Sequence, residues 1–178
     1  LQPMTLMGQT FTYYDGEAFA GLPLRQIGRF GAPVRSESLV MTEQNLLEAY
    51  RNENDVPEIP PYLIPGDSIA WTDEYPPAFR AYIESLPGLA GYTFYDGTGA
   101  QTRGFFVHAS RIEYDFHSSE NGRGLPITNR DPLGRDTVIE YDAFQLLPLS
   151  VTTPLNLTTR AQYDYRVVQP AVVTDPNG

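Results

Sequence analysis

Residues 131–134 read Asp-Pro-Leu-Gly, residues 153–156 read Thr-Pro-Leu-Asn, and residues 175–178 read Asp-Pro-Asn-Gly. The first residues of these tetrapeptides are 22 positions apart (153 − 131 and 175 − 153), which indicates an internal repeat. Proline presets the backbone at the second position of a tight turn, and a following glycine accepts the positive φ that closes it. The sequence therefore predicts short strands joined by turns at a constant spacing.

A Tyr-Asp pair lies inside each repeat, and a proline follows the aspartate by six residues. Alternation before each pair places the tyrosines on one face of their strands, so we expect Tyr141 and Tyr163 to point the same way and to be largely buried. We expect the aspartates to cap turn amides or to pair with an arginine on a neighbouring strand. The structural repeat positions are Asp131, Pro132, Gly134, Tyr141, Asp142, Pro148, Pro154, Tyr163, Asp164, Pro170, Asp175 and Pro176.

Further Tyr-Asp pairs at residues 14–15, 95–96 and 114–115 are interpreted as degenerate units with altered loops. The predicted fold is mainly β: antiparallel hairpin repeats stacked into a sheet, with two short helices in the middle segment. Thr42 is expected to cap the first helix, and Pro76 and Pro77 to begin the second. Strands are expected at 5–14, 32–40, 91–96, 103–116, 135–142, 148–152, 157–164 and 170–174.

Four segments follow from this pattern. Residues 1–40 form a degenerate β-repeat segment, and residues 41–90 an acidic insertion of helices and a proline-rich loop. Residues 91–130 form a β-strand segment, and residues 131–178 the Tyr-Asp repeats. Since a single hairpin cannot bury a face by itself, we expect the chain to be one fragment of a larger array.

Composition excludes several classes of function. The 178 residues carry a net charge of −10, which disfavours nucleic acids and anionic membranes as partners. Cysteine is absent and all 12 basic residues are arginine, so thiolate metal sites, disulfides, Schiff-base lysines and a Walker-type phosphate loop are excluded. No apolar run is long enough for a membrane-spanning helix.

The candidate catalytic residues are few. His108 and His117 lie nine residues apart without a metal-ligand spacing. The carboxylate pairs Glu113 with Asp115 and Glu140 with Asp142 each share a strand face, as a glycosidase pair could, but any strand of this composition produces such pairs. We therefore expect no catalytic residue, no metal, no cofactor and no enzymatic activity.

The 12 tyrosines allow one alternative. Exposed rings could stack on sugars, with Tyr14, Tyr95 and Tyr114 as the candidate positions, and the chain would then be a carbohydrate-binding β module of a secreted or cell-surface protein. The commoner use of such rings is a cross-strand ladder within a sheet. Burial of the rings distinguishes the two.

The repeat resembles the YD repeat of the Rhs family, and nearly the whole chain is similar to the B component of bacterial Tc insecticidal toxin complexes. The segments that carry this resemblance are TNRDPLGRD (128–136), YDAFQLLP (141–148), YDYRVVQP (163–170), YYDGEAFAGLPL (13–24) and YPPAFR (75–80).

The resemblance implies a role as a structural wall. In that family, B and C components build a hollow shell of Rhs repeats around a toxic enzyme, and the shell docks on a pore-forming A component. It implies that this chain contacts other Rhs repeats of the same subunit or of a C component. Contact with the A component would be made through regions outside this chain. It also implies a bacterial, secreted, extracellular virulence protein.

Overall fold

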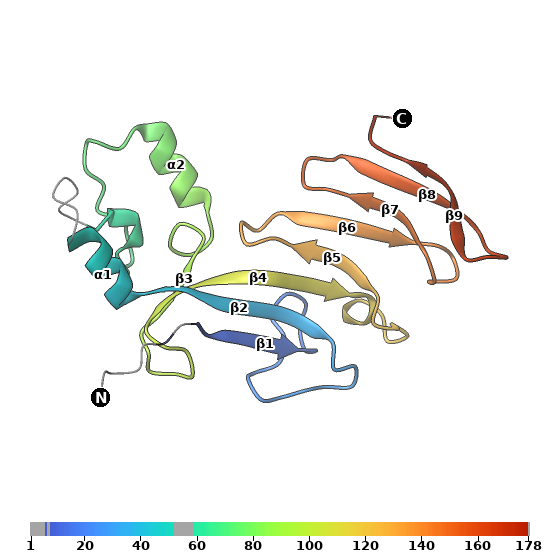
Figure 1. Ribbon diagram of the computed structural model, residues 1–178, viewed down its shortest axis with the longest axis horizontal. Coiled ribbons are helices and arrows are strands. Elements are labelled where there is room, and N and C mark those ends of the chain that lie inside the picture. Colours follow the sequence, from blue (N-terminus) through green and yellow to red (C-terminus); the bar gives the residue numbers. More distant parts are fainter. Residues whose placement is uncertain (1–5, 7, 52–58, 178) are drawn as a thin grey trace. The chain divides into compact units, whose positions relative to one another are not determined.

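The computed structural model describes residues 6, 8–51 and 59–177 and contains a nine-stranded sheet and two α-helices (Figure 1). The strands follow the order β1-β2-β4-β5-β6-β7-β8-β9, and β3 pairs with β4. The pairs from β3·β4 to β8·β9 are antiparallel, so the predicted fold class is confirmed. The elements are β1 (Thr10–Tyr14), β2 (Pro33–Thr42), α1 (Glu43–Arg51), α2 (Pro77–Ser85), β3 (Thr93–Tyr95), β4 (Gly104–Tyr114), β5 (Pro126–Arg130), β6 (Asp136–Tyr141), β7 (Pro148–Thr152), β8 (Thr158–Asp164) and β9 (Gln169–Thr174).

Two expectations about strands need correction. The strand expected at 5–14 begins at Thr10, and residues 5 and 7 lie outside the described residues. Strand β5 was not expected, because Pro-Ile-Thr-Asn-Arg begins with proline and shows no apolar alternation. Proline fits there because it is the first residue of the strand.

The chain divides into two compact units. Unit 1 holds the described residues up to Phe11 together with those of Ser36–Ala109 and Pro132–Gly134. Unit 2 holds Thr12–Arg35, Ser110–Asp131 and the described residues from Arg135 onward. The insertion with both helices therefore belongs to unit 1, and the consecutive hairpins β6–β7 and β8–β9 belong to unit 2.

Both predicted helices are present. Helix α1 follows Thr42, whose Oγ1 accepts a hydrogen bond from the Asn45 N–H at 3.1 Å, as expected for an N-cap. Helix α2 has proline in its first turn and ends at Ser85, where the Leu86 N–H donates to the Ile83 carbonyl. The following Pro87-Gly88 stops the helix, and Gly88 has a φ of +62°.

A small apolar core holds unit 1 together. Leu46 of α1, Leu63 and Phe105 of β4 are buried and pack against a ring of partly buried residues. A second cluster stabilises the insertion through edge-to-face and stacked rings with centroids 5.3–6.2 Å apart. Its members are Tyr62, Trp71, Tyr75 and Phe79.

In unit 2, strands β6 and β8 show the predicted alternation. Thr137, Ile139 and Tyr141 are partly buried, whereas the two residues between them are exposed. Strand β8 repeats this pattern around Ala161 and Tyr163. Both tyrosines thus share the less exposed face, but each is partly buried instead of largely buried.

We expect Gly88→Ala to destabilise the protein strongly. A Cβ at Gly88 would collide with the Tyr92 carbonyl oxygen, and the positive φ adds strain of about 1–3 kcal/mol. Gly134→Ala is the matched control, because Gly134 has a φ of +86° but no atom within 4 Å of its would-be Cβ. Thermal unfolding should show a clearly larger loss for Gly88→Ala. Equal losses would contradict a steric requirement at Gly88.

Candidate functional site: tyrosine–aspartate clamps

Three of the Tyr-Asp pairs of unit 2 close their loops with a common main-chain hydrogen bond. The N–H groups of Asp15, Asp115 and Asp142 donate to the carbonyls of Ala32, Leu125 and Leu147 at 2.8, 2.9 and 3.0 Å. In each case the acceptor directly precedes a proline that begins the return strand. The loops differ greatly in length, yet they start and finish with the same geometry.

The aspartate side chains satisfy the loop amides. Asp15 accepts from the N–H groups of Gly31 and Ala32 at 2.9 and 3.1 Å. Asp115 accepts from the three consecutive N–H groups of residues 123–125 at 2.8–3.0 Å. Asp142 accepts from those of residues 146 and 147 at 2.7 and 3.3 Å. All three aspartates are buried, so each clamp places a carboxylate beneath its loop.

Hydrogen bonding keeps the carboxylates of Asp115 and Asp142 ionised. Burial alone would raise the pKa of Asp115, but the amides of residues 123–125 outweigh burial and hold its pKa below the ordinary value. The Leu146 amide, aided by the Tyr165 hydroxyl, lowers the pKa of Asp142. These two clamps are therefore built around charged acceptors, which make the stronger kind of hydrogen bond.

The tyrosines of the pairs connect neighbouring strands. The Tyr114 hydroxyl donates to the Pro33 carbonyl at 3.0 Å, and the Tyr141 hydroxyl donates to the Pro126 carbonyl at 3.1 Å. Each acceptor is the first residue of the preceding return strand. Burial raises the pKa of both tyrosines, so each hydroxyl keeps the proton that it donates.

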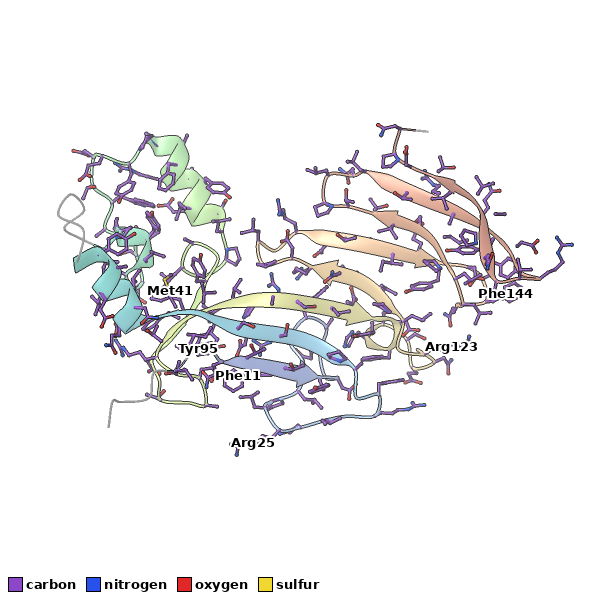
Figure 2. The ribbon with its side chains drawn as sticks, viewed as in Figure 1. Phe11, Arg25, Met41, Tyr95, Arg123 and Phe144 are labelled. Atoms are coloured by element: carbon purple, nitrogen blue, oxygen red, sulfur yellow. The ribbon has the colours of Figure 1, made fainter. Side chains whose placement is uncertain are left out.

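The loops that follow Tyr114-Asp115, Tyr141-Asp142 and Tyr163-Asp164 also contact one another through side chains. The Tyr165 hydroxyl donates to the Asp142 carboxylate at 2.7 Å, and its ring meets Phe144 edge to face. The Arg123 guanidinium donates to the Phe144 carbonyl at 3.0 Å (Figure 2). Asp164 instead accepts from the backbone and the guanidinium of Arg166, which lowers its pKa.

Left-handed residues and side-chain contacts both shape the turns of the repeats. Gly134 has a φ of +86°, and Asn156 takes the corresponding left-handed conformation at +59°. Asp131 accepts from the Arg135 N–H and ion-pairs with its guanidinium, while Arg130 and Asp136 form a two-pronged ion pair at 2.7 and 2.8 Å. Pro132 and Pro154 occupy these two turns, and Asp175 caps the following turn by accepting from the Asn177 N–H.

One expected unit is not a clamp. Tyr95-Asp96 follows the three-residue strand β3, and the Asp96 carboxylate turns back onto the amide and hydroxyl of Thr98. The Tyr95 hydroxyl donates to Glu37 at 2.9 Å. Residues 95–96 therefore end the first strand of the antiparallel β3·β4 hairpin without the clamp geometry seen in unit 2.

A buried carboxylate that the sequence did not indicate lies in unit 1. Glu37 of β2 is 0% exposed and accepts from the Tyr95 hydroxyl and from the Gln101 amide at 2.8 Å. His108 Nε2 lies 3.6 Å from the Glu37 carboxylate. A glutamate between serines predicts exposure, so only the assembled strands show that this residue is internal.

The candidate catalytic side chains have structural contacts. Glu113 accepts from the Thr128 hydroxyl and Glu140 from the Ser150 hydroxyl, while the aspartate of each pair serves its clamp. His117 Nδ1 accepts from the Tyr114 N–H at 2.8 Å, and burial lowers the pKa of this histidine. Among residues 6, 8–51 and 59–177, no group of three histidines or carboxylates could hold a metal ion.

The candidate sugar-stacking rings are at least partly covered. Tyr114 is 7% exposed and stacks on Phe116, and Tyr95 packs edge to face on Phe106. Tyr14 is partly buried, and its carbonyl accepts from the Leu22 N–H. The burial of Tyr114 and the packing of Tyr95 fit a role within the sheet better than a sugar-stacking surface.

Unit 1 contains two adjacent hollows of about 390 and 400 Å³. They share Gly66, Gly88 and Leu89, and their acidic lining comes from Asp67 and Glu84. The Glu84 carboxylate already accepts from the Trp71 indole N–H at 2.6 Å.

Replacing Asp115 by asparagine should remove a pH-dependent contribution to stability. Because the folded-state pKa of Asp115 is lowered, its contribution is complete above the unfolded pKa of about 3.9 and is lost as the pH falls through the folded value. We expect Asp115→Asn to cost about 1–3 kcal/mol at pH 7 and progressively less below about pH 4.

Denaturant unfolding between pH 7 and pH 2 measures this difference. Asp67→Asn is the matched control, since Asp67 is exposed and belongs to no clamp. A difference between wild type and Asp115→Asn that stays constant down to pH 2 would contradict a charged clamp.

The tyrosine hydroxyls should contribute measurably to stability. We expect Tyr114→Phe and Tyr141→Phe each to lower the free energy of unfolding by about 0.5–1.5 kcal/mol, the usual net value of one hydrogen bond. Tyr82→Phe in α2 is the control, because Tyr82 is 55% exposed. Equal effects in all three variants would show that the contacts to Pro33 and Pro126 contribute nothing specific.

Three crystal structures of the TcdB2-TccC3 Tc toxin complex show a similar fold. The structure with Cdc42 matches 98% of this chain at 20% identity and a TM-score of 0.61. The structure with TEV matches 99% at 18% identity and 0.60, and the one without the hypervariable C-terminal region matches 96% at 21% identity and 0.58. This chain spans 7% of each neighbouring chain. No family model and no curated protein match the sequence. The likeness assigns this chain a Tc/Rhs-like fold.

Proposed function

We propose that this chain is a non-catalytic wall segment of an Rhs-type β-shell that encloses a toxin cargo in a secreted toxin complex. The observation that carries the proposal is the fold, which matches TcdB2-TccC3 structures over 96–99% of the chain. A segment of a continuous wall would match a much longer chain in this way, over nearly its whole own length.

The clamps support a structural role. The carboxylates of Asp15, Asp115 and Asp142 all accept hydrogen bonds from loop amides. The hydroxyls of Tyr114 and Tyr141 connect neighbouring strands. These contacts hold successive hairpins in a fixed relation, as a wall requires. The helices of the described residues are too short and polar to cross a membrane.

In such a complex, other Rhs repeats of the same subunit or of a C component would be the direct neighbours. A pore-forming A component would be contacted through other regions, and the assembly would act outside the producing cell. These roles are part of the proposal and rest on the likeness of fold.

A graft into TcdB2-TccC3 tests the wall role. Replacing the matched segment of that complex by this chain should leave an enclosed cargo resistant to added protease. The matched controls are the same graft with Asp115→Ala and Asp142→Ala, and a flexible linker of equal length. Protection no better than that of the linker, from a graft whose circular dichroism shows a folded sheet, would overturn the proposal.

The absence of catalysis is tested separately. The isolated chain should hydrolyse no glycoside, peptide or phosphoester. Turnover that is abolished by Asp142→Asn or Glu113→Gln would show an enzyme instead.

A further inference from the structure

We propose that the hydrogen bond from the Tyr114 N–H to His117 is a pH-sensitive latch, and that protonation of the imidazole in mildly acidic solution opens the loop of residues 115–125. The inference concerns the response of unit 2 to pH and does not depend on the wall role. It rests on one hydrogen bond, on the burial of the imidazole and on the charges around it.

The register of the β4·β5 hairpin creates the need for the latch. The strand register shifts between Glu113 and Tyr114, and Tyr114 lies opposite Pro126. Such a shift locally disrupts the ladder of main-chain hydrogen bonds. Here the Tyr114 N–H donates to His117 Nδ1 at 2.8 Å. The histidine is within reach because residues Asp115–His117 form a short 3-10 helix directly after β4.

The latch fixes the protonation state of the ring. A backbone N–H can only donate, so Nδ1 of His117 carries no proton, and the proton of the neutral imidazole lies on Nε2. Nε2 is buried, and among residues 6, 8–51 and 59–177 it has no hydrogen-bond partner. A second proton on the ring would place an Nδ1–H against the Tyr114 N–H. The imidazolium therefore cannot keep the latch closed.

Three carboxylates act on the imidazole, and each is bonded to another donor. Glu113 accepts from the Thr128 hydroxyl, and Asp15 and Asp115 accept from the amides of their own loops. Their charges favour the protonated imidazole. Burial outweighs them and holds the pKa of His117 below its ordinary value. The closed loop thus resists protonation of the ring.

The direction of the pH dependence follows from this burial. Because the closed loop lowers the pKa of His117 below the ordinary value of about 6.5, the latch contributes its full stability above that pH. The contribution is lost as the pH falls through the lower pKa of the closed loop. Carboxyl groups ordinarily titrate near pH 4, and the pKa of Asp115 is lowered further, so this clamp stays charged where the latch opens.

The equivalent positions of the next two hairpins carry no titratable acceptor. The register shifts in the same way before Tyr141 in β6·β7 and before Tyr163 in β8·β9. The third residue after each of these positions is Phe144 or Arg166, and neither side chain accepts a hydrogen bond. Mild acid should therefore open the loop of residues 115–125 and leave the two following loops closed.

Opening of the loop would also disturb an aromatic stack. Phe116 lies between the two ends of the latch and stacks on Phe30 and on Tyr114, with ring centroids 4.3 and 5.2 Å apart. Its ring also contacts the imidazole, at 4.4 Å between centroids. Release of the latch would therefore loosen apolar packing as well as one hydrogen bond.

Hydrogen exchange of single amides, followed by NMR between about pH 7.5 and about pH 5, tests the latch. Protection factors, which correct for the pH dependence of intrinsic exchange, should fall several-fold on acidification for the amides of Tyr114 and residues 123–125. They should stay constant for the amides of residues 146 and 147, which belong to the next clamp.

Two variants separate the latch from other effects of acid. In His117→Asn the amide oxygen takes the place of Nδ1 as acceptor and does not titrate, so protection should be independent of pH. His108→Asn is the matched control, because His108 is the second of the two histidines, and this variant should keep the wild-type response. An equal loss of protection in wild type and His117→Asn would overturn the proposal.

Nitrogen NMR of the imidazole gives a readout that does not depend on stability. At the higher pH it should show the Nε2–H tautomer of His117, and on acidification the ring should gain a proton in step with the loss of protection. An Nδ1–H tautomer at the higher pH, or a ring that gains its proton while the Tyr114 amide stays protected, would contradict the latch.

Discussion

A carboxylate beneath a loop is the interaction on which the hairpin series depends. Loops leave backbone amides without sheet partners, and burying such groups unpaired is costly. Asp15, Asp115 and Asp142 resolve this by accepting two or three amides each, while their own N–H closes the loop. Because the aspartate directly follows the tyrosine, the same turn of chain at Asp115 and Asp142 also directs a tyrosine hydroxyl to the neighbouring strand. Loop closure and strand-to-strand attachment are thus one device.

The clamp tolerates loops of very different length. Ala32 follows Asp15 by 17 positions, Leu125 follows Asp115 by 10, and Leu147 follows Asp142 by 5. What lies between is free to vary, since the return strand is positioned by the hydrogen bonds at the two ends. Sheets held by main-chain bonds place few demands on side chains, which accounts for a shared fold at 18–21% identity with TcdB2-TccC3.

Unit 1 uses a different solution. Its insertion is held by a small apolar core and a cluster of four aromatic rings, and Glu37 is buried by donors from β3 and the loop before β4. A buried carboxylate contributes stability only when its donors are in place, so removing one donor should destabilise the whole site around Glu37. Tyr95 is followed by aspartate, as a clamp tyrosine is, but its hydroxyl donates to Glu37 instead.

The sequence by itself determined the local features. The 22-residue spacing of the turns, the Thr42 cap, the prolines of α2 and the alternation around Tyr141 follow from backbone preferences of single residues or near neighbours. Only the tertiary structure decided which carbonyl receives each tyrosine hydroxyl, that β5 is a strand, and that Glu37 is internal. Tyr114 and Pro33 are 81 residues apart, and their contact depends on β2 lying beside β4. Strand order of this kind arises from hydrogen bonds between distant segments, and the residue pattern of one strand does not encode its neighbour.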